Sequence, residues 1–338
     1  MSTQSFSWLH LSDFHFGLAG QNILWPNLRQ PFLDDLAVLH KQTGPWDAAF
    51  FTGDLVQQGK PEEFDDMQKE VLNRLREKLT ELGSGNAVLL AVPGNHDLCR
   101  PDPKADNPAV DKLLESGGFN SIATKFWGSP TNSYRQVISD AFAAYTNWWN
   151  ATDHRPQDLT TGELPGDFAC TLECNEHRIG IVGLNTAFLQ LQGGDYKEKL
   201  IWSTQQLQKV CGGAADDWLQ RHSLCLLLTH QGPDWLTPEA RKHGESEISP
   251  AGRFALHLYG HMHEGKIQYI RTGGNSDAIR LCQSCSVFGM EKFGEPPTLT
   301  RNHGYTVGRI EFAGNNARFR CWPRIATNNT GPWRFVSD

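Results

Sequence analysis

The chain has 338 residues, 39% of them hydrophobic and 20% charged, and a formal net charge of −7, values typical of a soluble globular protein. It contains no apolar run of the ~18 residues that a membrane span needs and no recognisable secretory leader, so we expect no membrane contact and a cytoplasmic location. Tight non-specific binding of nucleic acid needs a basic face, which the acidic balance disfavours. The eight cysteines are scattered, and we expect reduced thiols.

The first three quarters of the chain alternate short apolar runs with amphipathic stretches. Runs rich in Val, Leu and Phe predict buried strands, and apolar residues three or four apart predict helices. The predicted strands are 6–11, 48–51, 87–92, 178–184, 224–228 and 254–259, and the predicted helices are 28–42, 60–82, 136–150 and 203–220. Residues 17–26 and the proline-rich stretch 98–134 are predicted loops. This alternation implies parallel strands with crossover helices.

After residue 266 the pattern changes to short strands in succession. These are predicted at 267–271, 279–287, 305–312 and 317–322. We therefore expect an α/β (α+β) fold, a four-layer αββα sandwich of two mixed β-sheets flanked by helices.

One domain is predicted over residues 1–325, and residues 98–170 interrupt its regular pattern. We interpret 98–170 as a cap-like insertion beside the functional site. A surface insertion without a role is the alternative, because long loops cost little free energy. Residues 326–338 show no closing element, and we interpret them as a tail that begins a linker to a further domain.

Polar residues that can bind a metal follow five of the predicted strands. Ligands of open α/β sheets bind just outside the carboxyl ends of strands. The candidates are Asp13, His15, Asp54, Asn95, His96, Asp97, His230, His261 and His263. Carboxylate, amide and imidazole groups suit hard and borderline divalent ions. A lone histidine is more often structural, but so many candidate ligands on five converging loops indicate a metal site.

These residues form an ordered series of motifs. The series is Asp13-x-His15, Gly53-Asp54, Gly94-Asn95-His96-Asp97, His230 and Gly260-His261-x-His263. In this order it resembles the calcineurin-like metallophosphoesterase superfamily, over residues 13–263. The resemblance implies two divalent ions, with Mn²⁺ expected first and Fe or Zn²⁺ as alternatives.

The resemblance also implies a role for each residue. One ion would take Asp13, His15, Asp54 and His263, and the other Asp54, Asn95, His230 and His261, with Asp54 bridging. Two such ions lower the pKa of water and supply a hydroxide for in-line attack on phosphorus. In the family the histidine that matches His96 binds the phosphate, beside the asparagine that matches Asn95, and assists the leaving oxygen. Asp97 is expected to orient His96.

Two differences from the protein phosphatases of the superfamily narrow the range of expected activities. Protein phosphatases of the superfamily carry an arginine soon after the second aspartate and end the third motif in glutamate, whereas this chain has Gly53-Asp54-Leu-Val-Gln-Gln-Gly59 and Asp97. The stretch is similar to that of bacterial phosphodiesterases, including the class III cyclic-nucleotide group. We therefore expect a phosphodiesterase acting on a nucleotide-like diester.

Three alternatives stay open. Residues 9–17 are similar to the start of DNA-repair nucleases of the superfamily, so a DNA or RNA nuclease is one. It would need stacking platforms for bases, for which Trp127, Trp148 and Trp149 are candidates. A phosphomonoesterase is another. The third is a non-catalytic scaffold, which the intact ligand set disfavours.

Overall fold

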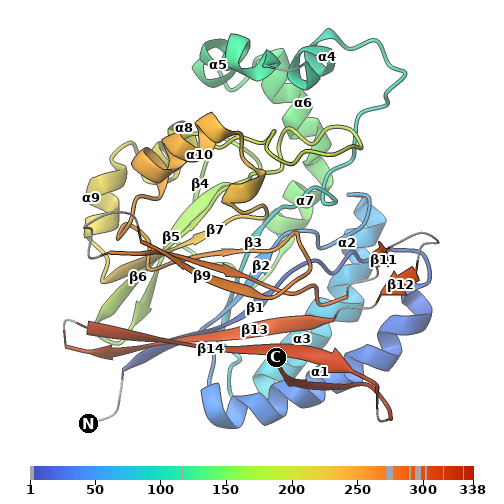
Figure 1. Ribbon diagram of the computed structural model, residues 1–338, viewed down its shortest axis with the longest axis vertical. Coiled ribbons are helices and arrows are strands. Elements are labelled where there is room, and N and C mark those ends of the chain that lie inside the picture. Colours follow the sequence, from blue (N-terminus) through green and yellow to red (C-terminus); the bar gives the residue numbers. More distant parts are fainter. Residues whose placement is uncertain are drawn as a thin grey trace.

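The computed structural model describes residues 4–115, 117–271, 277–288, 291–293, 298–300, 303–314, 316–329 and 331–338. Two β-sheets form the centre of the molecule, and helices cover their outer sides (Figure 1). This arrangement confirms the predicted sandwich. No helix in the described part of the chain combines the length and the apolar character that crossing a bilayer requires.

The six-stranded sheet has the order β15-β14-β13-β1-β2-β3. Its strands are β1 (Ser5–Leu11), β2 (Ala48–Thr52), β3 (Val88–Val92), β13 (Gly304–Ala313), β14 (Asn316–Thr327) and β15 (Arg334–Ser337). Strands β1, β2 and β3 are parallel, and β13 runs antiparallel to β1. The three parallel strands therefore bring their carboxyl ends to one edge.

The seven-stranded sheet has the order β4-β5-β6-β7-β8-β10-β9. Its strands are β4 (Thr160–Thr161), β5 (Phe168–Cys174), β6 (His177–Gly183), β7 (Leu224–Leu228), β8 (Leu256–Tyr259), β9 (Lys266–Ile270) and β10 (Ile279–Gln283). Strands β6, β7, β8 and β10 are parallel. A separate ribbon pairs β11 (Glu291–Phe293) with β12 (Thr298–Thr300). Strands β4 and β5 were not predicted from the sequence.

Helices cover both sheets, and two of the predicted helices are broken. The helices are α1 (Gln21–Thr43), α2 (Pro61–Met67), α3 (Asn73–Glu81), α8 (Thr204–Val210), α9 (Ala215–Gln220) and α10 (Pro238–His243). A π-helical turn (Gln68–Leu72) joins α2 to α3 in one continuous segment, as predicted. The glycine pair at 212–213, with positive φ at both residues, separates α8 from α9.

The predicted loop at 17–26 is wrong, because α1 already begins at Gln21 and contains Pro26. The Gln21 side chain donates to the Phe14 carbonyl and accepts from the Gly17 amide. Trp25 and other apolar residues of the helix are buried. Tertiary packing thus outweighs the cost of a proline within a helix.

Four helices lie within residues 108–151, which we call the helical insertion, so the predicted loop at 98–134 is also wrong. Strand β4 and the start of β5 also fall within 98–170 and belong to the seven-stranded sheet. The helical insertion contains α4 (Pro108–Leu114), α5 (Gly118–Gly128), α6 (Ser133–Ala141) and α7 (Ala143–Ala151). The break at Phe142 divides the predicted helix 136–150. Helices α4 to α6 project beyond the sheets at the top of Figure 1, and α7 packs on α2. Tyr145 of α7 donates to the carbonyl of Ala91 in β3.

Two of the candidate base-stacking tryptophans are not available to a ligand. Trp148 and Trp149 are buried, and Trp148 stacks on Phe64 with ring centroids 5.5 Å apart. Trp127 is partly buried and packs edge-on against Phe126. The interpretation of Trp148 and Trp149 as stacking platforms is wrong, because both rings are buried and Trp148 packs against α2. For Trp127 it stays a prediction.

The interpretation of 326–338 as a tail is corrected by strand β15, which pairs antiparallel with β14. Arg324 of β14 donates to the Asp35 carboxylate of α1, at 2.9 Å from Nε and 2.5 Å from Nη2, and to the carbonyl of Phe335. Tyr305 also donates to Asp35. Charge pairing and the buried Phe335 ring join this strand to the sheet and to α1.

Candidate metal centre

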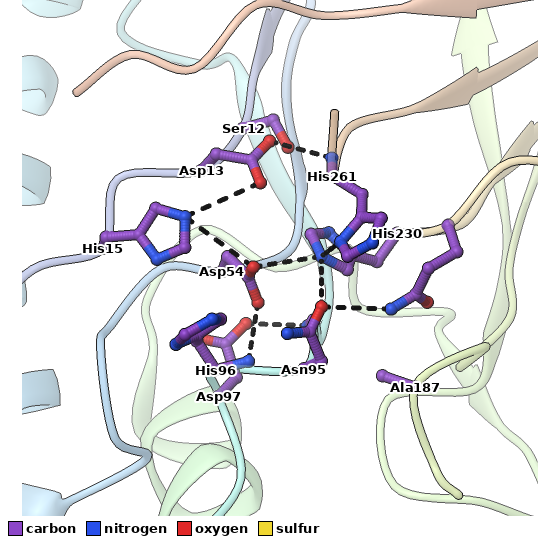
Figure 2. A network of polar contacts seen from close by, with 12 residues as sticks. Ser12, Asp13, His15, Asp54, Asn95, His96, Asp97, Ala187, His230 and His261 are labelled. Atoms are coloured by element: carbon purple, nitrogen blue, oxygen red, sulfur yellow. Dashed lines mark hydrogen bonds and ion pairs between the residues drawn. The ribbon is translucent and has the colours of Figure 1, made fainter. Parts of the chain in front are cut away.

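The seven predicted metal ligands lie together at the carboxyl ends of parallel strands from both sheets. Figure 2 labels all of them except His263. The six-stranded sheet supplies those after β1, β2 and β3, and the seven-stranded sheet those after β7 and β8. Asp13 and His15 follow β1, Asp54 follows β2, and Asn95 follows β3. His230 follows β7, and His261 and His263 follow β8. The convergence that the strand ends predicted is present in the fold.

The first cluster consists of Asp13, His15 and His263. The Nε2 atoms of His15 and His263 are 3.0 Å apart. Asp13 Oδ1 lies 3.3 Å from His263 Nε2 and 3.9 Å from His15 Nε2. The other oxygen of Asp13 accepts the amide of His261, which fixes the carboxylate and joins the loops after β1 and β8.

The second cluster consists of His230, His261 and Asn95. His230 Nε2 lies 3.2 Å from His261 Nδ1 and 3.2 Å from Asn95 Oδ1. His230 Nδ1 faces the carbonyl of Thr52 at 2.6 Å and donates to it, because a carbonyl can only accept. Nε2 is therefore the atom of His230 that faces the cluster.

Asp54 lies between the two clusters. Its Oδ2 is 3.1 Å from His230 Nε2 and 3.8 Å from His15 Nε2. Its Oδ1 accepts the amide of His96 at 2.7 Å. One carboxylate oxygen is thus held by the backbone, and the other is placed where it can serve both clusters.

The donor atoms fit divalent ions. In each cluster, nitrogen and oxygen atoms that can carry lone pairs approach within about 3 Å, and such atoms repel unless a proton or a cation lies between them. Imidazole nitrogen with carboxylate and amide oxygen suits Mn²⁺, Fe²⁺ or Zn²⁺. The arrangement offers two such sites with one carboxylate between them.

The backbone at these positions is unusual. Non-glycine residues seldom adopt positive φ, and those that do concentrate at functional sites. Five of the seven predicted ligands have φ between 47° and 74°: Asp13, His15, Asp54, His261 and His263. These left-handed residues turn the chain soon after β1, β2 and β8, so that their side chains can point to a common centre.

Two glycines permit the close approach of these loops. A Cβ at Gly94 would overlap the Asp54 carboxylate, and a Cβ at Gly260 would overlap the hydroxyl of Ser12. Any side chain at either position would push the loops apart.

Burial and neighbouring charges set the protonation of the cluster. Burial lowers the pKa of His15 to about 4 and that of His261 to about 3, so both rings are neutral near pH 7 and can donate a lone pair. Burial acts in the same direction on His230, but the Asp54 carboxylate outweighs it and raises the pKa of His230 to about 9. Burial opposes ionisation of Asp54, yet the neighbouring histidines hold its pKa well below the usual value.

His96 lies beside the first cluster, with its ring centroid 4.7 Å from that of His15. Its Nδ1 lies 2.9 Å from the Gln57 carbonyl and donates to it. Among the contacts of the described residues, no hydrogen bond joins His96 to Asp97. Asp97 is fully buried and accepts the amides of Gly94 and Val56, at 2.8 and 3.0 Å. The prediction that Asp97 orients His96 is therefore wrong: a backbone carbonyl does so, and Asp97 fixes the loop that carries Asn95 and His96.

Several supporting residues were not found from the sequence. The side-chain oxygen of Gln57 lies 3.1 Å from His15 Nδ1. Gln231 is buried and donates to Asn95 Oδ1 at 3.2 Å, and it also contacts Gln190 and Thr186. Nothing in the sequence marks these amides, apart from the position of Gln231 next to a ligand.

A family model described as calcineurin-like phosphoesterase matches residues 6–265. The chain belongs to this family. It is a metal-dependent hydrolase of phosphoester bonds, and the two clusters contain candidate groups for a divalent metal centre. Family membership and the assembled ligand set support an enzyme rather than a scaffold.

Other comparisons add little. No curated protein matches the chain. Similar solved structures include a putative 5'-nucleotidase from Staphylococcus aureus (11% identity, TM-score 0.40, 98% of this chain and 53% of that one) and the 5'-nucleotidase from Candida albicans SC5314 (11%, 0.42, 96% and 52%). Another is Vacuolar Protein Sorting 29 from Cryptosporidium parvum (9%, 0.38, 99% and 97%). The chain spans about half the length of both nucleotidases, and likenesses this weak carry no argument about substrate.

Proposed function

We propose that this hydrolase is a phosphodiesterase with two divalent ions, Mn²⁺ first among them, and that its substrate is a nucleotide-like diester. One ion would take Asp13, His15, Asp54 and His263, and the other Asp54, Asn95, His230 and His261. When bound, two such ions lower the pKa of a water molecule and stabilise charge on the phosphoryl oxygens.

The observation that carries the proposal is the stretch after Asp54. Leu55 and Val56 are fully buried, and the backbone carbonyl of Gln57 accepts a hydrogen bond from His96. The stretch 55–58 contains no arginine or lysine, so this loop itself offers no cation for the second negative charge of a phosphomonoester. A diester carries one negative charge fewer at phosphorus, so it needs less compensation.

His96 would act on the leaving group. Because Nδ1 donates to the Gln57 carbonyl, Nε2 is the atom that can face a substrate. In its protonated form the ring donates from Nε2 to a phosphoryl or leaving oxygen, and general acid catalysis of this kind contributes roughly 10²–10⁴-fold. Asn95 would bind substrate beside it through the amide group that also faces the second cluster.

The experiment compares hydrolysis of bis-p-nitrophenyl phosphate and p-nitrophenyl phosphate by protein stripped of metal and reloaded with Mn²⁺, Fe²⁺ or Zn²⁺. We expect kcat/KM for the diester to exceed that for the monoester at least tenfold, with the highest activity in Mn²⁺. A preference for the monoester would overturn the proposal and make the chain a phosphomonoesterase.

A further inference from the structure

A cavity of about 550 Å³ lies between the helical insertion and the body of the protein. Helices α4 and α5 line one side, with Leu113, Phe119 and Asn120. The connection between β6 and α8 lines the other side, with Leu189 and Tyr196. Pockets of about 300–1,000 Å³ accommodate drug-sized organic molecules.

Arg100 connects this cavity to the metal centre. Its Nη2 donates to the carbonyl of Asn95 at 3.4 Å. Its Nη1 lies 3.9 Å from the position that a Cβ on Gly193 would take, and Gly193 lines the cavity. One guanidinium group therefore lies near both the ligand loop and the cavity wall.

A second connection is buried. Gln231 joins Asn95 to Gln190, and Gln190 is the neighbour in sequence of Leu189, which lines the cavity. The position of Asn95 is thus fixed by the same loop that forms the cavity wall. The cavity wall and the candidate ligand Asn95 are thus joined through one short chain of buried amides.

The lining of the cavity favours an uncharged group. Leucine and aromatic side chains provide apolar contact, while three carboxylates and a single lysine stand among the lining residues. These charged residues are Glu115, Asp195, Glu198 and Lys199. A net negative rim repels a second phosphate and suits a group that donates hydrogen bonds.

We propose that this cavity binds the uncharged part of the substrate, a group with the flat apolar face of a nucleoside base, while Arg100 contacts the phosphoryl group between the cavity and the metal ions. The proposal rests on the proposed function. It predicts that small phosphoesters with one aromatic substituent are preferred over polyanionic nucleic acid, because the rim excludes further phosphates.

The test is calorimetric titration of the metal-loaded protein with adenosine, which has no phosphate and cannot react. We expect saturable binding, and we expect Tyr196→Leu and Asn120→Arg each to raise the Kd about tenfold, the loss that follows from removing one ring–base contact or obstructing the cavity. Tyr134→Leu removes an aromatic ring from α6 that does not line the cavity, and it should leave the Kd within twofold. Absence of binding to the wild-type protein, or an unchanged Kd in both cavity variants, would overturn the proposal.

Arg100→Met separates the two parts of the proposal. Its Kd for inorganic phosphate should rise about tenfold, while its Kd for adenosine stays within twofold. The opposite pattern would contradict the role given to Arg100. Hydrolysis of bis-p-nitrophenyl phosphate by the wild-type protein provides the independent check: activity without adenosine binding refutes only the cavity proposal, and adenosine binding without activity refutes only the proposed function.

Discussion

Gln231 offers a sharp test of how the second cluster is supported. Its buried amide donates to Asn95 Oδ1 at 3.2 Å and to Gln190, and its side-chain oxygen accepts from Thr186 at 2.6 Å. Replacing it with leucine removes three hydrogen bonds, each worth about 1 kcal/mol net, so we expect the free energy of unfolding to fall by about 3 kcal/mol. Loss of the one hydrogen bond to Asn95 should lower the affinity of the second cluster for its metal by about 10–100-fold.

The other metal provides an internal control for this variant. The first cluster has no hydrogen bond to Gln231 among the described contacts, so the affinity of its metal should change less than about threefold. Gln206→Leu is the matched variant: this buried amide also donates two hydrogen bonds, to Asp167 and the Asn185 carbonyl, but not to Asn95. It should lower stability and leave both metal affinities unchanged. Calorimetric metal titration of metal-free protein checks both variants, and equal weakening of the two metals in Gln231→Leu would refute the reasoning.

Three further predictions concern catalysis and stability. His96→Ala should bind both metals as the wild type does, by elemental analysis, and lose about 10²-fold or more in kcat; full activity across a pH series would contradict its role. Burial lowers the pKa of His257 to about 3, below the usual 6.5, so the folded state binds fewer protons than the unfolded state and stability falls as the pH drops below 6.5. At pH 5 that loss is about 2 kcal/mol relative to pH 8, and urea titrations of metal-free His257→Asn should show a pH dependence smaller by this amount; an unchanged dependence would contradict it. Arg324→Met leaves the buried Asp35 without its cation and should lower the free energy of unfolding by about 3 kcal/mol in urea titrations, whereas a change below about 1 kcal/mol would show that β15 depends little on this pair.

The metal centre could be predicted from the sequence because its candidate ligands directly follow the ends of strands. The apolar runs before Asp13, Asp54 and Asn95 form parallel neighbouring strands, so their loops meet at one edge of the sheet. Polar residues at the ends of such strands must therefore be close in space, whatever their separation in the chain.

What could not be predicted depends on tertiary contacts. Proline at position 26 indicates a loop, yet α1 continues through it because the helix packs its apolar side on the sheet. The role of Asp97 is decided by two backbone amides, of Gly94 and Val56, and no sequence pattern reports which amide faces a carboxylate. The role of Gln231 could not be predicted for the same reason, because it depends on contacts with Asn95 and Gln190.

The most direct test of the account is the number of metal ions per chain and its dependence on Asp54. We predict two bound divalent ions in the wild-type protein by calorimetric titration and elemental analysis. Asp54→Asn should lower the affinity for both ions, because Asp54 Oδ2 lies beside both His15 and His230. Asp13→Asn should lower chiefly the affinity for the ion of the first cluster. Activity that saturates with one ion per chain, or an Asp54→Asn variant that binds one of two ions as tightly as the wild type, would contradict the shared-carboxylate centre.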